Sequence, residues 1–478
     1  MLISGENSAS YTRRFPHLGI AYMTAVLKQN GLCCENRDMN LGYSSDQIIE
    51  FIKNSNVNLI CITIFSAGYK DVYSLIDFIK SHCDALVVVG GPHISITTKE
   101  VLEETRADFA IIGEGEYTLL ELVNEITKPH PKFEKIKGLI LRQGSKILVN
   151  EKRPYIQNLD ILPFPDFESF ELEKYLCYMD KRLPIVTSRG CPFHCNYCCT
   201  WLSMGRRFRA RSPDKVVDEI EYWYRKGWSI FDFNDDVFTL DRERAIKICK
   251  LILERRLNIQ FNLYVGIVVN SIDEELLKNL KAAGCKFISY GCEAGNDRIL
   301  KDIKKGIRVK DVINANDITR KVGINHKFNF IIGHPTETYK DAMDSIRLAK
   351  SLKCSFVAFN NHIPYPGTEV YTSIENNEKA RFLYPYKVYL NDLTHKRLLP
   401  VFERDYFNAE ERKKALIKGF NLEEKTLACF RFGKYKGLFV YILTRNKYVS
   451  KMSHWLFDVI VSTKVGSAFY KLIVKPPW

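Results

Sequence analysis

The sequence predicts an α/β protein with three parts: a doubly wound, Rossmann-like parallel sheet, a partial (β/α)6 barrel of the TIM type, and a helical C-terminal region. Three observations predict this fold. Short apolar runs alternate with helical segments in the first 125 residues, six strand–helix units follow from residue 183, and the pattern beyond residue 371 turns helical and polar. Strands that are buried on both faces and joined by helices form parallel sheets.

The N-terminal strands are continuous apolar runs. We expect them over 57–64, 85–89 and 109–112. Helices are expected between them, over 71–80 and 99–104. Two of the strands end in glycine-rich segments, Gly90-Gly91-Pro92 and Gly113-Glu114-Gly115-Glu116. Ligands of doubly wound sheets bind beyond the carboxyl ends of the strands, so these segments mark a candidate binding site.

The second series repeats the strand–helix pattern in the middle of the chain. Its strands are expected over 184–187, 230–233, 260–265, 287–290, 325–332 and 357–362. Its helices are expected over 213–226, 242–255, 273–283, 309–322 and 339–352. Six such units in succession predict a partial barrel, whose functional residues would follow the strand ends.

Four segments follow from these patterns. Residues 1–137 form the N-terminal domain, and 138–182 form a hairpin with its turn at Gln143-Gly144 and then a linker rich in proline. Each proline of the linker blocks helix and ladder bonding, which favours an extended chain. Residues 183–372 form the barrel, and 373–478 form a helical region that is basic and aromatic.

Composition excludes several classes of protein. The chain has 478 residues, of which 46% are hydrophobic and 26% charged, and this balance excludes disordered and collagenous proteins. No apolar run approaches the roughly 18 residues of a membrane span, and the first 14 residues lack the apolar core of a signal peptide. We therefore expect a cytoplasmic protein.

The net charge of +14 is concentrated at the C-terminus. Residues 431–478 contain nine Lys and Arg, ten aromatics and one acid, Asp458. Three interpretations stay open for this segment: peripheral contact with an anionic membrane, nucleic-acid binding, or a helical cap on the barrel. The helical cap is the most favoured of them, because cationic stretches usually form solvated faces, and nucleic acid is the least favoured.

Four of the 14 cysteines fall within nine residues. Cys191, Cys195 and Cys198 have the spacing C-x3-C-x2-C on a loop after an expected strand, and Cys199 is read as a small buried side chain. Three thiolates on one short loop can bind three irons of a four-iron cluster and leave the fourth open. Zinc is the alternative, although zinc sites favour a second, distant pair of cysteines.

The cysteine loop resembles the cluster motif of the radical S-adenosylmethionine (SAM) superfamily. Later motifs resemble its subgroup with an N-terminal cobalamin (B12)-binding domain, which includes class B methyltransferases and anaerobic cyclases. These motifs are Phe233-Asn-Asp-Asp-Val-Phe238, Gly291-Cys-Glu-Ala-Gly295, Lys305-Gly306, Gly333-His-Pro-Thr-Glu337 and Pro364-Tyr-Pro-Gly-Thr368. Each follows an expected strand, and the resemblance spans residues 1 to 370.

The resemblance implies a [4Fe–4S] cluster held by Cys191, Cys195 and Cys198. It also implies that SAM binds the open iron and is cleaved to a 5′-deoxyadenosyl radical. The residues implied near SAM are Tyr197, Asp235, Glu293 and Gly333. The charge of Glu293 agrees with this role, because a molecule with a sulfonium and an ammonium group favours a nearby carboxylate.

The N-terminal domain resembles cobalamin-binding domains at Pro16-His-Leu-Gly19 and in its two glycine-rich segments. The cobalamin residues implied are Gly90, Gly91, Pro92, Gly113, Glu114, Gly115 and Glu116. The motif Asp-x-His-x-x-Gly, which supplies a histidine to cobalt in many such domains, is missing. His93 is a substitute to consider, although a loop histidine more often forms hydrogen bonds.

The resemblance implies an enzyme that methylates an unactivated carbon of a small-molecule or lipid-like substrate. SAM would serve twice, as methyl source and as radical source, with a one-electron donor such as flavodoxin or ferredoxin. A radical cyclase, oxidase or carbon–carbon coupling enzyme is the alternative. From other classes, a zinc-stabilised nucleic-acid-binding protein explains the charge and cysteines but not the strand-end motifs. A binding module whose cluster site has lost its function is a further alternative, and the three intact cysteines argue against it.

Overall fold

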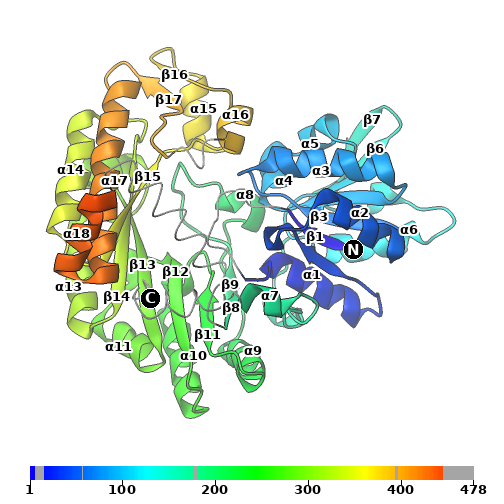
Figure 1. The fold of residues 1–478 in the computed structure, drawn as a ribbon, viewed down its shortest axis with the longest axis horizontal. Coiled ribbons are helices and arrows are strands. Elements are labelled where there is room, and N and C mark those ends of the chain that lie inside the picture. The colour runs from blue at the N-terminus through cyan, green and yellow to red at the C-terminus, as the bar shows by residue number, and fades with distance from the viewer. Residues whose placement is uncertain (6–14, 56, 177–180, 393–396, 445–478) are drawn as a thin grey trace.

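A computed structural model of the chain describes residues 1–5, 15–55, 57–176, 181–392 and 397–444 (Figure 1). It contains the doubly wound domain, the partial barrel and the helical C-terminal region that the sequence predicts. No helix in these ranges is long and apolar enough to cross a membrane. Most of the segment 431–478 lies outside the described residues, apart from its first fourteen.

The N-terminal sheet has the strand order β2-β1-β3-β4-β5-β6-β7, and its first five strands are parallel. These strands are β1 (Leu2–Ser4), β2 (Asn36–Asp38), β3 (Leu59–Thr63), β4 (Leu86–Gly90) and β5 (Phe109–Ile111). The helices around them are α1 (Leu18–Gln29), α2 (Ser45–Asn54), α3 (Tyr69–His82), α4 (Pro92–Thr97), α5 (Glu100–Glu104) and α6 (Glu116–Ile126). The chain reverses its winding direction between β1 and β3, where such sheets bind ligands.

The hairpin predicted after residue 137 is present. Strands β6 (Leu139–Gln143) and β7 (Lys146–Val149) are antiparallel, and β6 pairs with β5. The N-terminal sheet therefore continues through residue 149, past the position at which the sequence pattern separates the two segments.

The second sheet has the order β15-β14-β13-β12-β11-β8, and all of its strands are parallel. The strands are β8 (Arg182–Ile185), β11 (Ile230–Phe233), β12 (Gln260–Ile267), β13 (Cys285–Glu293), β14 (Asn325–Ile332) and β15 (Phe356–Asn361). The outer helices are α9 (Pro213–Arg225), α10 (Arg242–Glu254), α11 (Glu274–Ala282), α13 (Val309–Val322) and α14 (Tyr339–Ser351). All six expected strands are confirmed, and β11 and β14 have the expected bounds.

Capping residues set where the outer helices begin. A side-chain oxygen accepts a hydrogen bond from a first-turn amide at four of these helices, and the residues are Ser212, Asp241, Asp273 and Thr338. Such caps each contribute about 1 kcal/mol. They fix the register of each helix against the strand that precedes it.

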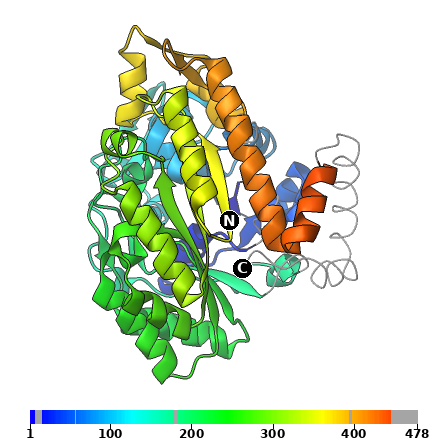
Figure 2. The same cartoon turned by 90° about the vertical axis from the view of Figure 1, so that its left-hand side faces the viewer.

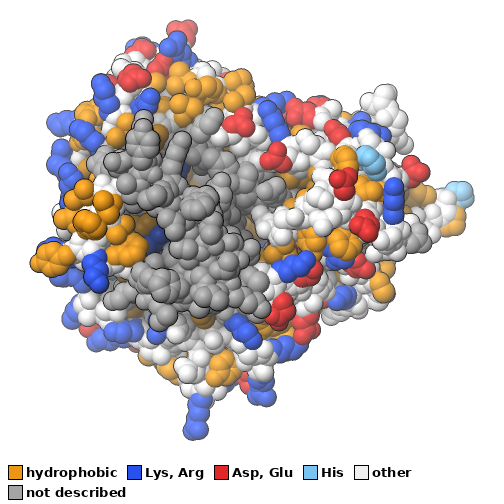
Figure 3. All heavy atoms as spheres, in the orientation of Figure 1, with side chains coloured by type: hydrophobic (Ala, Val, Ile, Leu, Met, Phe, Trp, Pro, Cys, Tyr) orange, Lys and Arg blue, Asp and Glu red, His pale blue; other side chains and the backbone are white. Residues whose placement is uncertain are grey.

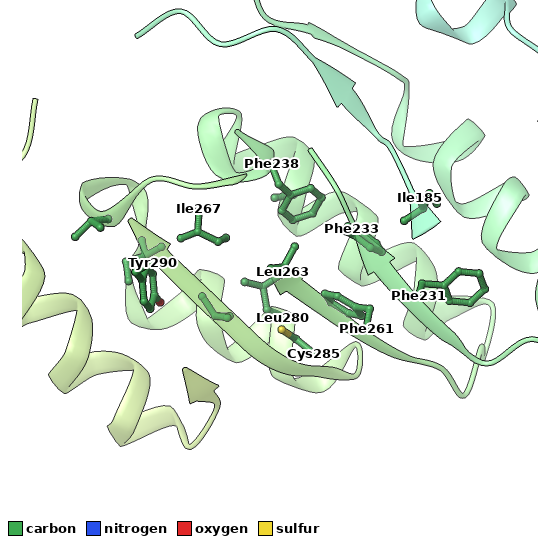
Figure 4. Close-up of a cluster of buried hydrophobic side chains, with 14 of the residues drawn as sticks. Ile185, Phe231, Phe233, Phe238, Phe261, Leu263, Ile267, Leu280, Cys285 and Tyr290 are labelled. Carbon is green, nitrogen blue, oxygen red and sulfur yellow. The ribbon is translucent and has the colours of Figure 1, made fainter. Parts of the chain in front are cut away.

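The barrel core consists of aromatic and aliphatic side chains from neighbouring strands (Figure 4). Phe233 and Phe261 stack with ring centroids 4.9 Å apart, and both are fully buried. Burial of one such side chain stabilises the fold by about 1.5–3 kcal/mol. The core fixes the strands and leaves their carboxyl ends free for other residues.

The C-terminal region closes the open edge of the barrel. Helix α17 (Ala409–Phe432) lies along β15 and α14 (Figure 2), and α18 (Lys434–Thr444) packs against it. The shorter helices are α15 (Glu369–Glu375) and α16 (Tyr386–Asp392). A small antiparallel pair, β16 (Ala380–Phe382) with β17 (Phe402–Arg404), was not predicted, because strands of three residues leave no periodic pattern.

Candidate active site

The cysteine loop is an insertion between two very short paired strands. Strand β9 (Ser188–Arg189) precedes it and β10 (Arg209–Ala210) follows it, and the two strands are antiparallel. Gly190, directly before Cys191, has a φ of +84°, and a Cβ there would lie 2.3 Å from the carbonyl oxygen of Arg207. Only glycine fits this turn, which directs the chain into the loop.

The three cysteines of the loop are half-buried and share one environment. Burial raises the pKa of Cys191 to about 11, and the neighbouring thiols of Cys198 and Cys195 add to this effect. Burial also raises the pKa of Cys195, while the charge of Lys305 opposes it. Three thiolates this close together are unfavourable without cations, and bound iron would supply the positive charge.

The spacing of the three cysteines on one loop suits a four-iron cluster, in which each cysteine binds a different iron. Among the described residues, no group of three or more His, Cys, Asp or Glu side chains is placed to hold one metal ion.

A partly buried ion pair lies beside the loop. The ammonium of Lys305 donates to Oε1 of Glu293 at 2.9 Å and to the hydroxyl of Tyr197 at 3.4 Å. Glu293 has a φ of +70°, which is rare for a residue with a side chain. A Cβ on Gly291 would lie 2.5 Å from the Glu293 carboxylate, so a side chain at this position would displace the carboxylate from its ion pair.

Two histidines from neighbouring strand ends lie against Tyr197. The rings of His334 and His362 are perpendicular, with centroids 5.1 Å apart, and each meets the Tyr197 ring edge-on. Burial lowers the pKa of both histidines, so both are neutral. The backbone carbonyl of Gly333 accepts from the buried Arg412 of α17 at 3.3 Å, which ties the C-terminal helix to this edge.

Glu337 closes this cluster and gives the protein a pH-sensitive group. Its Oε2 accepts from the amide of His334 at 3.1 Å, and burial raises the pKa of Glu337 to about 8. Between the ordinary pKa of 4.5 and about 8 the folded state holds more protons than the unfolded state, so stability falls as pH rises. The two neutral histidines affect the pH dependence of stability only below their ordinary pKa of 6.5, where the unfolded state would protonate them.

We therefore expect thermal stability to fall between pH 6.5 and pH 8 because of Glu337. The slope is at most about 1.4 kcal/mol per pH unit for one group. The variant Glu337→Gln keeps an acceptor for the backbone amide but does not titrate, so its melting temperature should change less over this interval. Melting curves at both pH values check this, and equal pH dependence in the two proteins would contradict it.

A cavity of about 410 Å³ lies between the two domains. The N-terminal domain lines it with the ends of β1, β3, β4 and β5, and the barrel lines it with residues next to the cysteine loop. All seven residues predicted for cobalamin line this cavity: Gly90, Gly91, Pro92, Gly113, Glu114, Gly115 and Glu116. Its barrel side includes Arg189, Met204 and Asp236.

Two comparisons with protein families agree with this geometry. Residues 185–349 match the family model of the radical SAM superfamily, and residues 8–123 match the model of the B12 binding domain. An uncharacterized methyltransferase of Pyrococcus horikoshii is 31% identical over 415 residues, which cover 85% of this chain and 87% of that protein. The chain belongs to the radical SAM superfamily, with a B12-binding domain at its N-terminus.

Further relatives of this radical SAM protein include a cyclase. The anaerobic magnesium-protoporphyrin IX monomethyl ester cyclase of Rubrivivax gelatinosus is 27% identical, and the match covers 80% of this chain and 71% of that one. The solved structure of the methyltransferase TsrM from Kitasatospora setae has a TM-score of 0.70 at 19% identity, covering 80% of this chain and 78% of TsrM. The cobalamin-dependent enzyme OxsB has a TM-score of 0.69 at 17% identity, covering all of this chain and 76% of OxsB. The fold is shared with both.

The residues of this radical SAM protein fit the cofactors of its family, which are a [4Fe–4S] cluster, SAM and cobalamin. Three half-buried thiols on one loop suit the cluster. The carboxylate and ammonium beside them suit the charged ends of SAM, and the cavity has a glycine-rich wall that a corrin can approach closely. Burial raises the pKa of Cys199 to about 12, somewhat above that of the candidate ligand Cys191, which burial raises to about 11.

Asp235 has a different position from the one that its motif suggested. It is fully buried and accepts hydrogen bonds from the amide and hydroxyl of Thr187 and from the hydroxyl of Ser188. Its neighbour Asp236 lines the cavity, and Oδ2 of Asp236 accepts from the amide of Gly190 at 3.0 Å. Successive residues face opposite ways here, so Asp236 reaches the cofactor side while Asp235 braces the strand that precedes the loop.

His93 does not replace the missing cobalt ligand. Its ring nitrogens are 3.0 Å from the hydroxyl of Tyr73 and 3.1 Å from that of Ser66, and its ring stacks on Tyr69. It is buried and does not line the cavity. The interpretation as a hydrogen-bonding core residue therefore holds.

The sequence did not single out several side chains of this site. His334 and His362 lie within or next to predicted motifs, and Arg412 comes from a helix more than 70 residues beyond Gly333. Arg189 and Arg209 flank the cysteine loop directly, and this placement in the sequence could have marked them as residues of the site. The contacts themselves depend on tertiary packing and could not be read from spacing.

Proposed function

We propose that this radical SAM protein transfers a methyl group from SAM to an unactivated carbon of a small-molecule or lipid-like substrate. The observation that carries the proposal is the cavity between the domains. One of its walls consists of the glycine-rich loops of the B12-binding domain, and the other lies next to the cysteine loop. When bound, the cluster and SAM supply the hydrogen-abstracting radical, and cobalamin supplies the methyl group. A shared cavity brings these two activities together at one substrate carbon.

The chain's own residues would orient SAM. Glu293 and Lys305 form an ion pair of the same two charge types as the α-amino and α-carboxylate groups of SAM. We propose that Glu293 receives the ammonium and Lys305 the carboxylate, while the Tyr197 ring and Gly333 border the adenosyl part. Asp235 would act indirectly, through the strand that it holds.

The experiment uses anaerobic protein reconstituted with iron, sulfide and hydroxocobalamin, and SAM labelled in its methyl group. It is incubated with panels of small-molecule and lipid acceptors and a one-electron donor of the flavodoxin or ferredoxin type. We expect a product with the labelled methyl and formation of 5′-deoxyadenosine. A changed product without label would favour the alternative, a cyclase, oxidase or coupling enzyme, which the 27% identity to a cyclase supports.

We also propose that the start of the C-terminal segment contacts an anionic membrane surface. Helix α18 exposes one apolar face, with Tyr435 84%, Phe439 63% and Ile442 60% exposed. Hydrophobic side chains gather there among Lys and Arg side chains (Figure 3). A groove beside α18 is lined by Arg347, Lys350, Lys418 and Lys425 and by no acidic residue. Such a face suits an interfacial helix.

Replacing Tyr435, Phe439 and Ile442 together by serine should reduce binding to vesicles that contain anionic lipid. Each aromatic or aliphatic side chain contributes about 1.5–3 kcal/mol when it leaves water, so we expect a loss of at least about tenfold. Flotation with phosphatidylglycerol vesicles measures it, and Leu253→Ser, an exposed leucine on α10, is the control. Equal flotation of all three proteins would contradict membrane contact.

A further inference from the structure

The cysteine loop has a narrow neck formed by two arginines. Arg189 ends β9 directly before the loop, and Arg209 begins β10 directly after it. The two residues are paired across the antiparallel strands. Both side chains are buried, so two like charges lie opposite each other where the loop begins and ends.

The N-terminal domain supplies the carboxylate that neutralises this neck. Oε1 of Glu114 accepts from Arg189 at 2.9 Å and from Arg209 at 2.8 Å, and Oε2 accepts from Arg209 at 2.9 Å. Oε1 of Glu116 accepts from Arg189 at 2.7 Å. Glu114 lies between β5 and α6 and Glu116 begins α6, in the segment that the sequence assigned to cobalamin.

Each of the four side chains is less than one-tenth exposed. Buried charges hold their geometry strongly, because a shift leaves a charge without a partner in a medium of low polarity. Arg189, Glu114 and Glu116 also line the cavity. The same carboxylates therefore belong both to the wall of the cofactor cavity and to the support of the cluster loop.

The side-chain hydrogen bonds from Asp235 and Asp236 of the barrel hold the neck at β9. Asp236 accepts from the amide of Gly190, and Asp235 accepts from Thr187 and Ser188. These bonds fix β9. Arg209 forms its ion pair with Glu114 and also donates to the backbone carbonyls of Ile156 and Met204, at 2.8 Å each. The second half of the neck thus takes its ion-pair partner from the N-terminal domain, while the charge of Asp236 acts on both arginines without forming an ion pair.

We propose that Glu114 is a positioning residue that sets the distance between the cluster and the cobalt by clamping both ends of the cysteine loop to the B12-binding domain. Glu116 supports the clamp by holding Arg189. This deepens the proposed function, and it rests on cobalamin occupying the cavity. It assigns to Glu114 a mechanical role toward the loop in place of direct contact with cobalamin.

The test is the magnetic interaction between the two cofactors in the holoprotein. Protein with four irons and one cobalt is prepared with cob(II)alamin, and the electron-spin relaxation of the cobalt is measured with the cluster oxidised and reduced. In the wild type the reduced cluster should accelerate relaxation uniformly. Glu114→Gln should lose part of this acceleration and show a spread of rates, because the neck is released.

A control and a second variant separate positioning from folding. Asp232→Asn breaks the buried pair of Asp232 with Arg182, 3.1 Å apart within the barrel, and should keep wild-type relaxation. If Glu114→Gln loses a cofactor, Arg189→Lys is measured, since lysine keeps the charge but cannot bind both glutamates in a fork. Either variant that retains both cofactors with wild-type relaxation overturns the proposal. If the wild type shows the accelerated relaxation and Glu114→Gln loses it, but the wild type transfers no methyl group, only the proposed function is contradicted.

Discussion

Replacing Cys198 by alanine is expected to abolish the four-iron cluster and with it the formation of 5′-deoxyadenosine. Cys198 is the third thiol of the loop, and the loop offers no other group at its position: its neighbour Cys199 has a pKa raised by burial to about 12. Two ligands leave two irons of the cube without a protein thiolate, and cluster binding needs deprotonated cysteines. We expect at least about a thousandfold loss of SAM cleavage, comparable to the loss of a whole catalytic unit.

The matched control for this variant is Cys199→Ala. It removes one thiol from the adjacent position, and alanine is tolerated where a cysteine acts as a small apolar side chain. Iron and sulfide counts, the visible spectrum and the release of 5′-deoxyadenosine under reducing conditions should be normal in this protein. Equal loss of iron in both variants would show that the ligand set differs from Cys191, Cys195 and Cys198.

Gly90→Phe is expected to remove cobalamin and leave the cluster in place. Gly90 lines the cavity between the domains, and a Cβ there would have no neighbour within 4 Å. The phenyl ring can therefore enter the cavity without a clash at its base, in the space that the corrin needs. Overpacking a binding site by one aromatic ring costs several kcal/mol, so we expect affinity for hydroxocobalamin to fall at least about a hundredfold.

The control is Val149→Phe, which adds an aromatic ring to an exposed position of the same sheet. Cobalt and iron counts after reconstitution and gel filtration measure the outcome. Gly90→Phe should retain four irons per chain and lose cobalt, whereas Val149→Phe should retain both. Normal cobalt in Gly90→Phe would exclude this cavity as the cobalamin site.

The sequence predicted the regular fold well because burial on both faces leaves a strong signal. The strands β3 and β4 are nearly continuous apolar runs, and they appeared where expected. The polar strand β2 (Asn36–Asp38) did not, because its polar side chains are satisfied by tertiary contacts such as the bond from Tyr175 to Asp38 at 2.7 Å. Strands of this kind follow from the sheet and not from their own composition.

The candidate site was predicted in its composition more than in its geometry. Glu293, Gly333 and Lys305 all belong to motifs of the sequence, but only the structure shows that Lys305 pairs with Glu293 and that Arg412 binds Gly333. For Asp235 and Asp236 the motif could not say which residue faces the cavity, since this depends on the backbone at the end of β11. Glu114 lines the cavity, and its predicted contact with cobalamin stays a prediction. Its two arginine partners depend on domain packing.

The ion pair of Glu293 with Lys305 has a consequence for the binding of SAM. In the structure these two charges neutralise each other at 2.9 Å. The amino and carboxylate groups of SAM bring one charge of each sign to this pair, and the sulfonium adds one further positive charge. Because ionic strength acts mainly on net and exposed charge, the salt dependence of SAM affinity should report the sulfonium and not the amino-acid end.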